Sequence, residues 1–333
     1  MTAVTADTTP FRWGILGVAR INRVQLVPLN TGRHRLVAIA SRTTARAEAY
    51  AAEHGIPRAY GSYDALLADP EIDAVYVPVP NSLHAELTIR AAAAGKHVLC
   101  EKPLALSADE VRAIAAAADA NDVVVTEAFM YRHHPVVSRT RALVQEGVIG
   151  RVIGLTGVFS FTHDRPADVR FDPALGGGSL WDVGCYPVSF ARTVLGQRPV
   201  AVQGTAAWSP RGVDLSFFGQ VIFENDVVAQ VMSSFEAPFR TEMEVIGTLG
   251  RLRVPHPFKP QERDVIEVIR GESTETIEVQ GPPLYQGQAD DLADAARSRR
   301  PPLVTLDDSL DNTETLVALL EAARSGSTVT LSR

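Results

Sequence analysis

The chain has 333 residues, of which 46% are hydrophobic and 21% charged, and its net charge is −7. This length favours two globular domains, and the composition excludes a wholly disordered or fibrous chain. A nucleic-acid partner is not expected, because phosphate binding needs a clustered basic face. The one dense basic run, at residues 297–300, is typical of a solvated helix end.

The sequence shows no sign of a membrane segment or of a metal site. No apolar stretch approaches the roughly eighteen residues that cross a bilayer, and the N-terminus lacks the layout of a signal peptide. We therefore expect a cytoplasmic protein without membrane contact. Cys100 and Cys185 are too far apart in sequence to suggest a disulfide framework or a zinc site, and the eight histidines show no metal-binding spacing.

Short apolar runs alternate with alanine-rich helical segments in the first third of the chain. Strands are expected at residues 11–16, 35–40, 74–79, 97–101 and 123–128. Helices are expected at 43–55 and 107–121, and the second begins at Ser107 with Glu110 three residues later, as in a capping box. Strict alternation of strand and helix predicts a Rossmann-type, doubly wound α/β fold with a parallel sheet.

Long β-rich runs follow residue 150. They cover residues 151–162, 215–226, 227–238 and 242–254. The Glu-Asn-Asp sequence at 224–226 predicts a hairpin turn, and helices near 288–298 and 308–325 close the chain. The pattern predicts an α+β domain with an open, mostly antiparallel sheet. We divide the chain into domains at 1–127 and 128–333.

A glycine-containing loop follows the first expected strand and predicts a site for the pyrophosphate of a dinucleotide. We assign its contacts to Gly17, Val18, Ala19, Arg20 and Ile21. The N–H groups that begin the following helix would receive the phosphate charge. The spacing departs from the usual fingerprint, because Ala19 and Asn22 stand where glycine is common. A tight turn in some other doubly wound protein is the alternative.

The end of the second expected strand distinguishes NADP from NAD. An NAD site usually has an acidic residue there for the ribose hydroxyls, whereas this chain has Ser41 and Arg42. Both can bind a 2′-phosphate, the arginine through charge-assisted hydrogen bonds. The sequence therefore favours NADP(H), although Arg42 could also be a solvent-exposed residue at a helix start.

Four further segments resemble a known family. They are VPVPNSLHAE at 77–86, CEKP at 100–103, TEAFMYRHHP at 126–135 and GGGSLWDVGCYPV at 176–188. Together they resemble the glucose-fructose oxidoreductase, inositol dehydrogenase and MocA (Gfo/Idh/MocA) family, over the chain up to about residue 250. The resemblance implies an NADP-binding Rossmann domain, then a substrate domain whose open sheet pairs copies into a homodimer or homotetramer.

Within that family the chain resembles the NADP-dependent branch of dihydrodiol dehydrogenases, aldose dehydrogenases and nucleotide-sugar 3-ketoreductases, and most of all the dTDP-3-keto-6-deoxyhexose 3-ketoreductase type. The inositol dehydrogenase pattern has a histidine four residues after its aspartate. This chain instead has Tyr186 four residues after Asp182. The resemblance thus implies that Lys102 and Tyr186 carry the proton chemistry.

The chemistry of these residues fits that assignment. Lys102 follows an expected parallel strand, at the sheet edge where doubly wound folds bind ligands. Its ammonium or the Tyr186 hydroxyl can protonate the alkoxide that hydride transfer to a ketone leaves. Asp182 could orient the lysine or a sugar hydroxyl. The alternatives are a surface Lys102, a core Tyr186 and an Asp182 that simply favours a helix N-terminus. The resemblance implies a cis peptide bond before Pro103.

The resemblance also implies further cofactor contacts. These are Pro78, Asn81, His84, Glu101, Lys102 and Arg170. His84 could equally face solvent at a helix start. His133 and His134 are interpreted as a loop pair with satisfied hydrogen bonds, and Cys185 as a small buried hydrophobic residue.

The sequence therefore predicts an NADPH-dependent ketoreductase whose small-molecule substrate is the C-3 ketone of a dTDP-linked deoxysugar. Arg165 and residues 256–259 are candidates for binding the nucleotide half. An aldose dehydrogenase, acting for example on D-xylose, or a trans-dihydrodiol dehydrogenase is the alternative within the family. A non-catalytic NADP-binding regulator is the alternative from another class.

Overall fold

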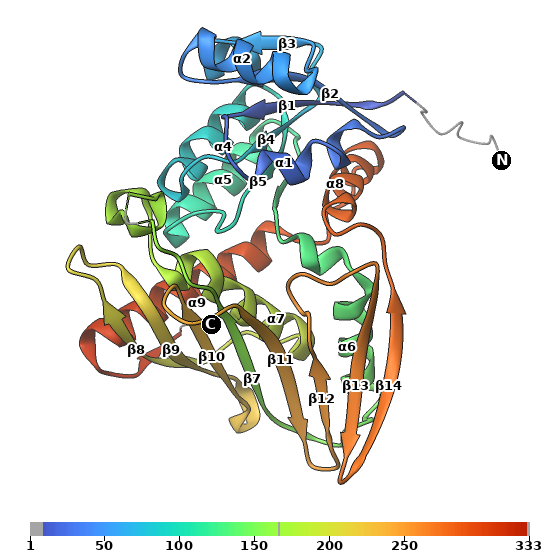
Figure 1. Cartoon of the computed structure of the whole chain (residues 1–333), viewed down its shortest axis with the longest axis vertical. Helices are drawn as coiled ribbons and strands as arrows, with labels where there is room; N and C mark the ends of the chain where they lie inside the picture. The colour runs from blue at the N-terminus through green and yellow to red at the C-terminus, as the bar shows by residue number, and fades with distance from the viewer. Residues whose placement is uncertain (1–8, 166, 332–333) are drawn as a thin grey trace, which may run out of the picture.

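The computed structural model describes residues 9–165 and 167–331, which form two sheets stacked end to end along the long axis of the molecule (Figure 1). The first sheet has the strand order β3-β2-β1-β4-β5-β6, and the second has the order β14-β13-β12-β11-β7-β10-β9-β8-β15. The Rossmann-type parallel sheet and the second, mostly antiparallel sheet that the sequence predicts are both confirmed.

All strand pairs of the first sheet are parallel. Its strands are β1 (Phe11–Leu16), β2 (His34–Ala40), β3 (Arg58–Tyr60), β4 (Ala74–Val77), β5 (His97–Cys100) and β6 (Val125–Glu127). The strand order reverses beside β1, which pairs with both β2 and β4. Ligands of doubly wound sheets bind at such a switch point, outside the carboxyl ends of the strands. Strand β3 was not expected from the sequence.

Five helices connect these strands. They are α1 (Asn22–Gln25), α2 (Thr44–His54), α3 (Tyr63–Leu67), α4 (His84–Ala93) and α5 (Ala108–Ala120). The Ser107 hydroxyl caps α5 by accepting from the Glu110 N–H at 3.2 Å. The Glu110 carboxylate accepts from the N–H of Leu106, not from that of Ser107. The predicted capping box therefore closes one residue earlier than its usual form.

The second sheet contains more strands than the sequence indicated. Its strands are β7 (Val152–Ser160), β8 (Ala201–Trp208), β9 (Asp214–Ile222), β10 (Val228–Ser234), β11 (Arg240–Gly247), β12 (Arg251–Val254), β13 (Arg263–Arg270), β14 (Ser273–Gln280) and β15 (Val329–Thr330). Only β7 and β10 pair in parallel. The expected turn at 224–226 joins β9 to β10, with positive φ at Asn225 and Asp226. The run at 242–254 is two strands, β11 and β12, joined by a turn.

Helices cover the inner face of this sheet (Figure 1). They are α6 (Pro135–Gln145), α7 (Cys185–Leu195) and α9 (Leu306–Ser325). Short 3-10 turns cover Pro28–Asn30, Asn81–Leu83, Met130–His133, Val169–Phe171, Pro173–Leu175 and Glu224–Asp226. One large core cluster fills the space between the sheet and these helices.

Helix α8 (Gln286–Ser298) follows the second sheet in sequence but packs on the first (Figure 1). Leu292 and Ala293 share a core cluster with Trp13. The Asp290 carboxylate lies 2.9 Å from the His34 ring. The boundary near residue 127 stays a prediction, and a helix from beyond it completes the first layer. No helix within 9–165 and 167–331 is long and apolar enough to span a membrane.

Candidate active site

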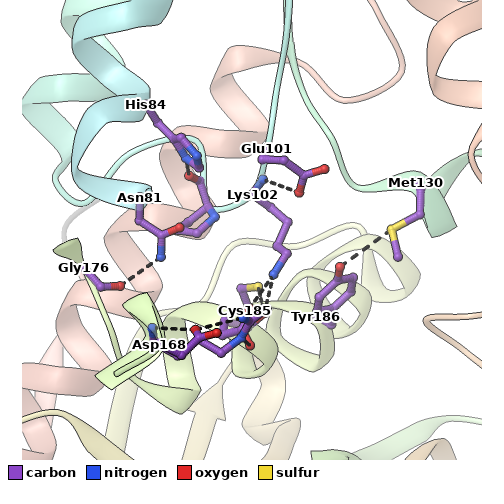
Figure 2. Close-up of polar contacts among 12 residues, drawn as sticks. Asn81, His84, Glu101, Lys102, Met130, Asp168, Gly176, Cys185 and Tyr186 are labelled. Carbon is purple, nitrogen blue, oxygen red and sulfur yellow. Dashed lines mark hydrogen bonds and ion pairs between the residues drawn. The ribbon is translucent and has the colours of Figure 1, made fainter. Parts of the chain in front are cut away.

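Lys102 lies directly after β5, and its side chain points towards the helical segment that carries Cys185 and Tyr186 (Figure 2). Its Nζ donates to the Asp182 carbonyl oxygen at 2.6 Å and contacts the Asp182 carboxylate at 3.1 Å. The side chain is only 12% exposed. The Lys102–Pro103 peptide bond is cis. The lysine is therefore a buried, paired ammonium at the carboxyl edge of the first sheet, not a surface residue.

A π-helical turn, Leu180–Gly184, presents Asp182 to the lysine and leads into α7. The second carboxylate oxygen of Asp182 accepts from the Nε of Arg170 at 2.6 Å. The Nη1 of Arg170 contacts Asp168 at 3.1 Å. Charges thus alternate along one network from Lys102 to Asp168. Arg170 thus pairs with Asp182, while the contact with the cofactor that the resemblance implies for it stays a prediction.

This network fixes the protonation states of the site. Burial alone would lower the pKa of Lys102, but the Asp182 carboxylate outweighs burial and raises it above its ordinary value. Burial likewise opposes ionisation of Asp182, and Lys102 and Arg170 overcome it, so the pKa of Asp182 lies well below its usual range. At neutral pH Lys102 is an ammonium ion and Asp182 a carboxylate.

Three side chains hold the backbone that carries Lys102. The Glu101 carboxylate accepts from the Lys102 N–H at 3.3 Å, and the Glu127 carboxylate accepts from the Leu104 N–H at 2.9 Å. The His84 Nδ1 lies 2.6 Å from the Pro103 carbonyl oxygen (Figure 2). The loop is therefore set by contacts with several elements, and this limits where the ammonium can go.

His84 is fully buried at the start of α4, so the alternative of a solvent-facing histidine is wrong. Its Nε2 lies 2.8 Å from the Val79 carbonyl oxygen. Both ring nitrogens thus face acceptors, which favours a protonated ring, while burial lowers the pKa of His84 to about 4. Burial outweighs the two carbonyl groups, so the ring is neutral at pH 7 and donates to only one of them.

Tyr186 contributes its ring to the lysine and its hydroxyl to a different residue. The Lys102 Nζ lies 5.2 Å from the centre of the Tyr186 ring. The hydroxyl contacts the Met130 sulfur at 3.7 Å (Figure 2). Burial raises the pKa of Tyr186 well above its ordinary value. Both candidate proton carriers therefore hold their protons at neutral pH, and the Lys102 ammonium is the one in the charge network.

The loop after β1 suits a dinucleotide pyrophosphate. Gly17 has φ +128°, a conformation that residues with a Cβ rarely adopt. Its carbonyl oxygen accepts from the Asn22 side-chain amide at 2.9 Å. The backbone N–H groups of Val18, Ala19, Arg20 and Ile21 donate to no described residue. Four consecutive unpaired backbone donors supply the chemistry that an anion such as a phosphate needs, so the phosphate site stays a prediction.

Helix α1 differs from the expectation, because it has only four residues. Its dipole is correspondingly small, so the prediction of a phosphate site rests on the unpaired N–H groups of the loop and not on the helix.

The end of β2 also leaves donors free. Ser41 is buried and Arg42 is exposed, and neither side chain forms a hydrogen bond or ion pair in the described part of the chain. The nearby Arg46 guanidinium donates to the Val18 carbonyl oxygen at 3.0 Å, so it tethers the phosphate loop. This arrangement fits a phosphorylated ribose, which would accept from both free side chains.

Residues assigned to the nicotinamide half surround the Lys102 loop. Pro78 is buried after β4, and the Asn81 amide donates to the Gly176 carbonyl oxygen at 2.9 Å (Figure 2). Glu101 accepts from the Tyr76 hydroxyl at 2.6 Å, and burial raises its pKa. Of the three, Glu101 contacts Lys102 directly, and the contacts of all three with the cofactor remain predictions.

The sequence did not assign a role to Glu127, Tyr285 or Asp168. Glu127 stands in the quoted TEAFMYRHHP segment, so the motif marked it without revealing its contact with the Lys102 loop. Tyr285 precedes α8, and burial raises its pKa to about 12, with Glu101 and Lys102 as its charged neighbours. No local signal could place it there, because α8 returns to the first sheet from far along the chain.

The other residues that the sequence analysis singled out agree with its interpretation in some cases and not in others. Cys185 and Cys100 are buried free thiols, as expected of small hydrophobic residues. His134 caps α6 by accepting from the Val136 N–H. The Nε2 atoms of His133 and His134 are buried without a partner among the described residues, so the interpretation as a satisfied pair is wrong in that respect. Arg165 is exposed. No group of three metal-ligating side chains occurs within 9–165 and 167–331.

Comparison with known proteins identifies the family. Residues 11–129 match the oxidoreductase family with an NAD-binding Rossmann fold, and residues 137–253 match the GFO/IDH/MocA C-terminal domain. The chain belongs to the Gfo/Idh/MocA oxidoreductase family. It therefore has a nicotinamide-dinucleotide domain followed by the family's open-sheet domain.

Relatives with named activities share between a third and two fifths of their residues with this chain. A D-xylose 1-dehydrogenase (NADP(+)) of Haloferax volcanii is 40% identical over 96% of this chain and 99% of its own length. A dTDP-3,4-didehydro-2,6-dideoxy-alpha-D-glucose 3-reductase of Saccharopolyspora spinosa is 36% identical over 75% and 76%.

Solved structures show the same fold over nearly the whole chain. The aldose-aldose oxidoreductase of Caulobacter crescentus superposes with a TM-score of 0.89 at 30% identity, covering 97% of this chain and 100% of that one. A 3-ketoreductase of Actinomadura kijaniata, solved with NADP and TDP-benzene, superposes with a TM-score of 0.88 at 31% identity, covering 96% and 98%.

Proposed function

We propose that this chain is an NADPH-dependent reductase of a sugar carbonyl group. The observation that carries the proposal is the buried Lys102 ammonium, which Asp182 holds in its protonated form. A positioned, protonated lysine is suited to donate a proton to an oxygen that gains negative charge. The Tyr186 hydroxyl also keeps its proton, and its ring lies beneath the Lys102 ammonium.

The proposed reaction needs one hydride and one proton, and Lys102 is its proton donor. Bound NADPH supplies a hydride to the carbonyl carbon. Lys102 gives a proton to the carbonyl oxygen, so the product is an alcohol, and the lysine recovers its proton from water. Asp182 keeps its negative charge throughout, because Lys102 and Arg170 hold its pKa far below neutrality. Its role is to position the ammonium and to stabilise it.

We infer that the cofactor is NADP(H) and not NAD(H). The free Ser41 hydroxyl and Arg42 guanidinium at the end of β2 support this inference, and no acidic residue stands there to repel a phosphate. The two named relatives from H. volcanii and A. kijaniata, described with NADP, agree with it.

The substrate we propose is the C-3 ketone of a dTDP-linked keto-deoxysugar. The 3-reductase relative and the 3-ketoreductase structure with a TDP ligand support it. A second candidate is the NADP⁺-dependent oxidation of a free aldose such as D-xylose. The specific observation in its favour is the 40% identity with a D-xylose 1-dehydrogenase over almost the full length of both chains.

One spectrophotometric experiment separates these candidates. Absorbance at 340 nm is followed with NADPH and a freshly generated dTDP-3-keto-deoxyhexose, and in parallel with NADP⁺ and D-xylose or a dihydrodiol. Consumption of NADPH with the nucleotide sugar alone supports the proposal. Turnover of D-xylose alone would assign the second candidate. Cofactor binding without turnover of any sugar would instead favour a regulatory protein.

We further propose that copies of the chain associate through the outer face of the second sheet. A hollow of about 580 Å³ on this face is lined by Thr156, Gln203, Gln220 and Gln230 together with apolar side chains. Phe218 on the same face is 49% exposed. Light scattering after gel filtration should give the mass of a dimer or tetramer, and Phe218→Glu should shift it towards the monomer. An unchanged mass would exclude this face.

A further inference from the structure

Lysine is rare in this chain, and each lysine has a distinct environment. Among 32 lysines and arginines, only Lys96, Lys102 and Lys259 are lysines. Lys96 is buried and donates to two backbone carbonyl oxygens. Lys102 is paired with Asp182. Lys259 has neither a carbonyl acceptor nor a carboxylate partner among the described residues, and the proposed reaction does not use it.

Lys259 stands on the same aromatic cluster as Lys102. It lies between β12 and β13, with its Nζ 5.6 Å from the centre of the Phe159 ring and 5.8 Å from that of Phe239. The Phe159 ring is 5.3 Å from the Tyr186 ring, over which the Lys102 ammonium lies. A continuous row of aromatic contacts therefore joins the two ammonium groups.

The charge of Lys259 is not neutralised locally. Lys102 and Arg170 both pair with Asp182, and Arg170 also pairs with Asp168. Lys259 forms no hydrogen bond or ion pair within the described residues. Lys259 is an exposed residue; partial burial and the positive charge of Lys102 lower the pKa of its ammonium, and Asp182 opposes both. An anion beside Lys259 would relieve the repulsion among these cations.

The Glu101 carboxylate, an anion near Lys102, does not supply that anion. It is occupied by the Tyr76 hydroxyl and the Lys102 N–H, on the first-domain side of the site (Figure 2). The dinucleotide loop at Gly17 also lies in the first domain, whereas Lys259, Phe159 and Phe239 come from the second. A group held at Lys259 thus belongs to the substrate and not to the cofactor phosphates.

We propose that Lys259 is the binding site for an oxyanion carried by the substrate, with Phe159 and Phe239 shielding one side of its ammonium. The proposal deepens the proposed function, on which it rests, by adding a charge requirement to the sugar. The diphosphate of a nucleotide-linked sugar supplies this chemistry, and the carboxylate of a sugar acid is a second source of it. A compact ammonium is strongly attracted to such oxygens.

Binding is measured by isothermal titration calorimetry on the NADPH-loaded protein, so that the result does not depend on turnover. The probes are dTDP, thymidine and D-glucuronate. The variants are Lys259→Gln, Lys259→Arg and, as a matched loss of one charge far from the site, Arg35→Gln at the exposed start of β2. We expect Lys259→Gln to weaken dTDP binding by about tenfold or more, as loss of one charge-assisted contact does. Lys259→Arg and Arg35→Gln should stay near the wild type.

The outcomes separate the subsite from the reaction. Thymidine should bind the wild type and Lys259→Gln equally, because it lacks the phosphates. A Lys259-dependent affinity for D-glucuronate but not for dTDP would keep the oxyanion site and assign it to a carboxylate. Equal binding of both anions to the wild type and to Lys259→Gln, or no binding of either, would overturn the proposal. Reduction of a sugar ketone with no Lys259-dependent binding would overturn the oxyanion site and leave the proposed function intact. Lys259-dependent binding without any turnover would support the oxyanion site and contradict the proposed function.

Discussion

Two regions of the molecule differ in how their polar groups are paired. One is the surroundings of Lys102, and the other is the dinucleotide edge of the first sheet, which comprises residues 17–21, Ser41 and Arg42. Around Lys102 the charged groups of one network pair with partners of opposite sign, from Lys102 through Asp182 and Arg170 to Asp168. At the phosphate loop and the end of β2, backbone N–H groups, the Ser41 hydroxyl and the Arg42 guanidinium have none in the described structure. The protein itself therefore positions the groups that we propose to react, whereas the donors that we propose to bind the cofactor have no partner in the described structure.

Replacing the proton donor should give the largest effect. Lys102→Ala removes the group that protonates the carbonyl oxygen, so turnover with the sugar ketone should fall about 1,000-fold. The dissociation constant of NADPH, followed by its fluorescence, should change little, because the free donors of the dinucleotide edge remain. A Lys102→Ala variant with wild-type turnover would remove the lysine from the chemistry.

Neutralising the positioning carboxylate comes next. Asp182→Asn keeps the shape but leaves Lys102 and Arg170 without their anion, so turnover should fall about 100-fold through displacement of the ammonium. The pH profile tests this role separately. Reduction needs protonated Lys102, so the wild-type rate falls as pH rises through its raised pKa.

In Asp182→Asn the charge that raises the Lys102 pKa is gone and burial remains, so the fall should move to lower pH. The matched control is Asp164→Asn, at an exposed aspartate between β7 and the 3-10 turn that carries Arg170. Its profile should match the wild type. Identical profiles for the control and for Asp182→Asn would mean that Asp182 acts only on folding.

The dinucleotide edge should respond less, and only in binding. Arg42→Ala should raise the KM for NADPH about 10- to 100-fold, the cost of one charge-assisted hydrogen bond to a phosphate. The KM for NADH should stay unchanged, because that cofactor has no 2′-phosphate. Equal effects on the two cofactors, or a similar effect of Arg35→Ala, would contradict the assignment.

The smallest effect on turnover is expected behind the Lys102 loop. Burial raises the pKa of Glu127 to about 7. This folded-state pKa lies above the unfolded value of about 4.5. The contribution of Glu127 to the free energy of unfolding is therefore fully present below about pH 4.5. It is lost as the pH rises through 7, and the full loss is about 3 kcal/mol.

Glu127→Gln keeps an oxygen for the Leu104 N–H but does not ionise. Its melting temperature relative to the wild type should therefore increase between pH 5 and pH 8, as followed by calorimetry. Parallel melting curves over that range would show that Glu127 titrates at its ordinary pKa.

Sequence patterns predicted what depends on local periodicity. The parallel sheet followed from alternating strands and helices, and the turn at residues 224–226 from its short polar sequence. Strand β3 was missed because its three residues, Arg58–Tyr60, are all only partly buried and carry no apolar run. The packing of α8 on the first sheet depends on the path of the whole chain, which no local pattern encodes.

The same limit applies to the site. The motifs located Lys102, Asp182 and Tyr186, and the structure brings the first two into contact. The motifs could not show that Arg170 pairs with Asp182, or that the Tyr186 hydroxyl turns to Met130, because both contacts depend on the π-helical turn before α7. Residue type was thus predictable where chemistry demanded it, and pairing was not.

The most direct test of the account is the pH dependence of kcat for carbonyl reduction, with saturating NADPH and saturating sugar ketone. A protonated Lys102 as donor predicts a rate that is constant around neutrality and falls at high pH, above the ordinary pKa of a lysine. A rate that rises with pH across the neutral range would show that a deprotonated group does the work, and would contradict the assignment of Lys102 as the acid.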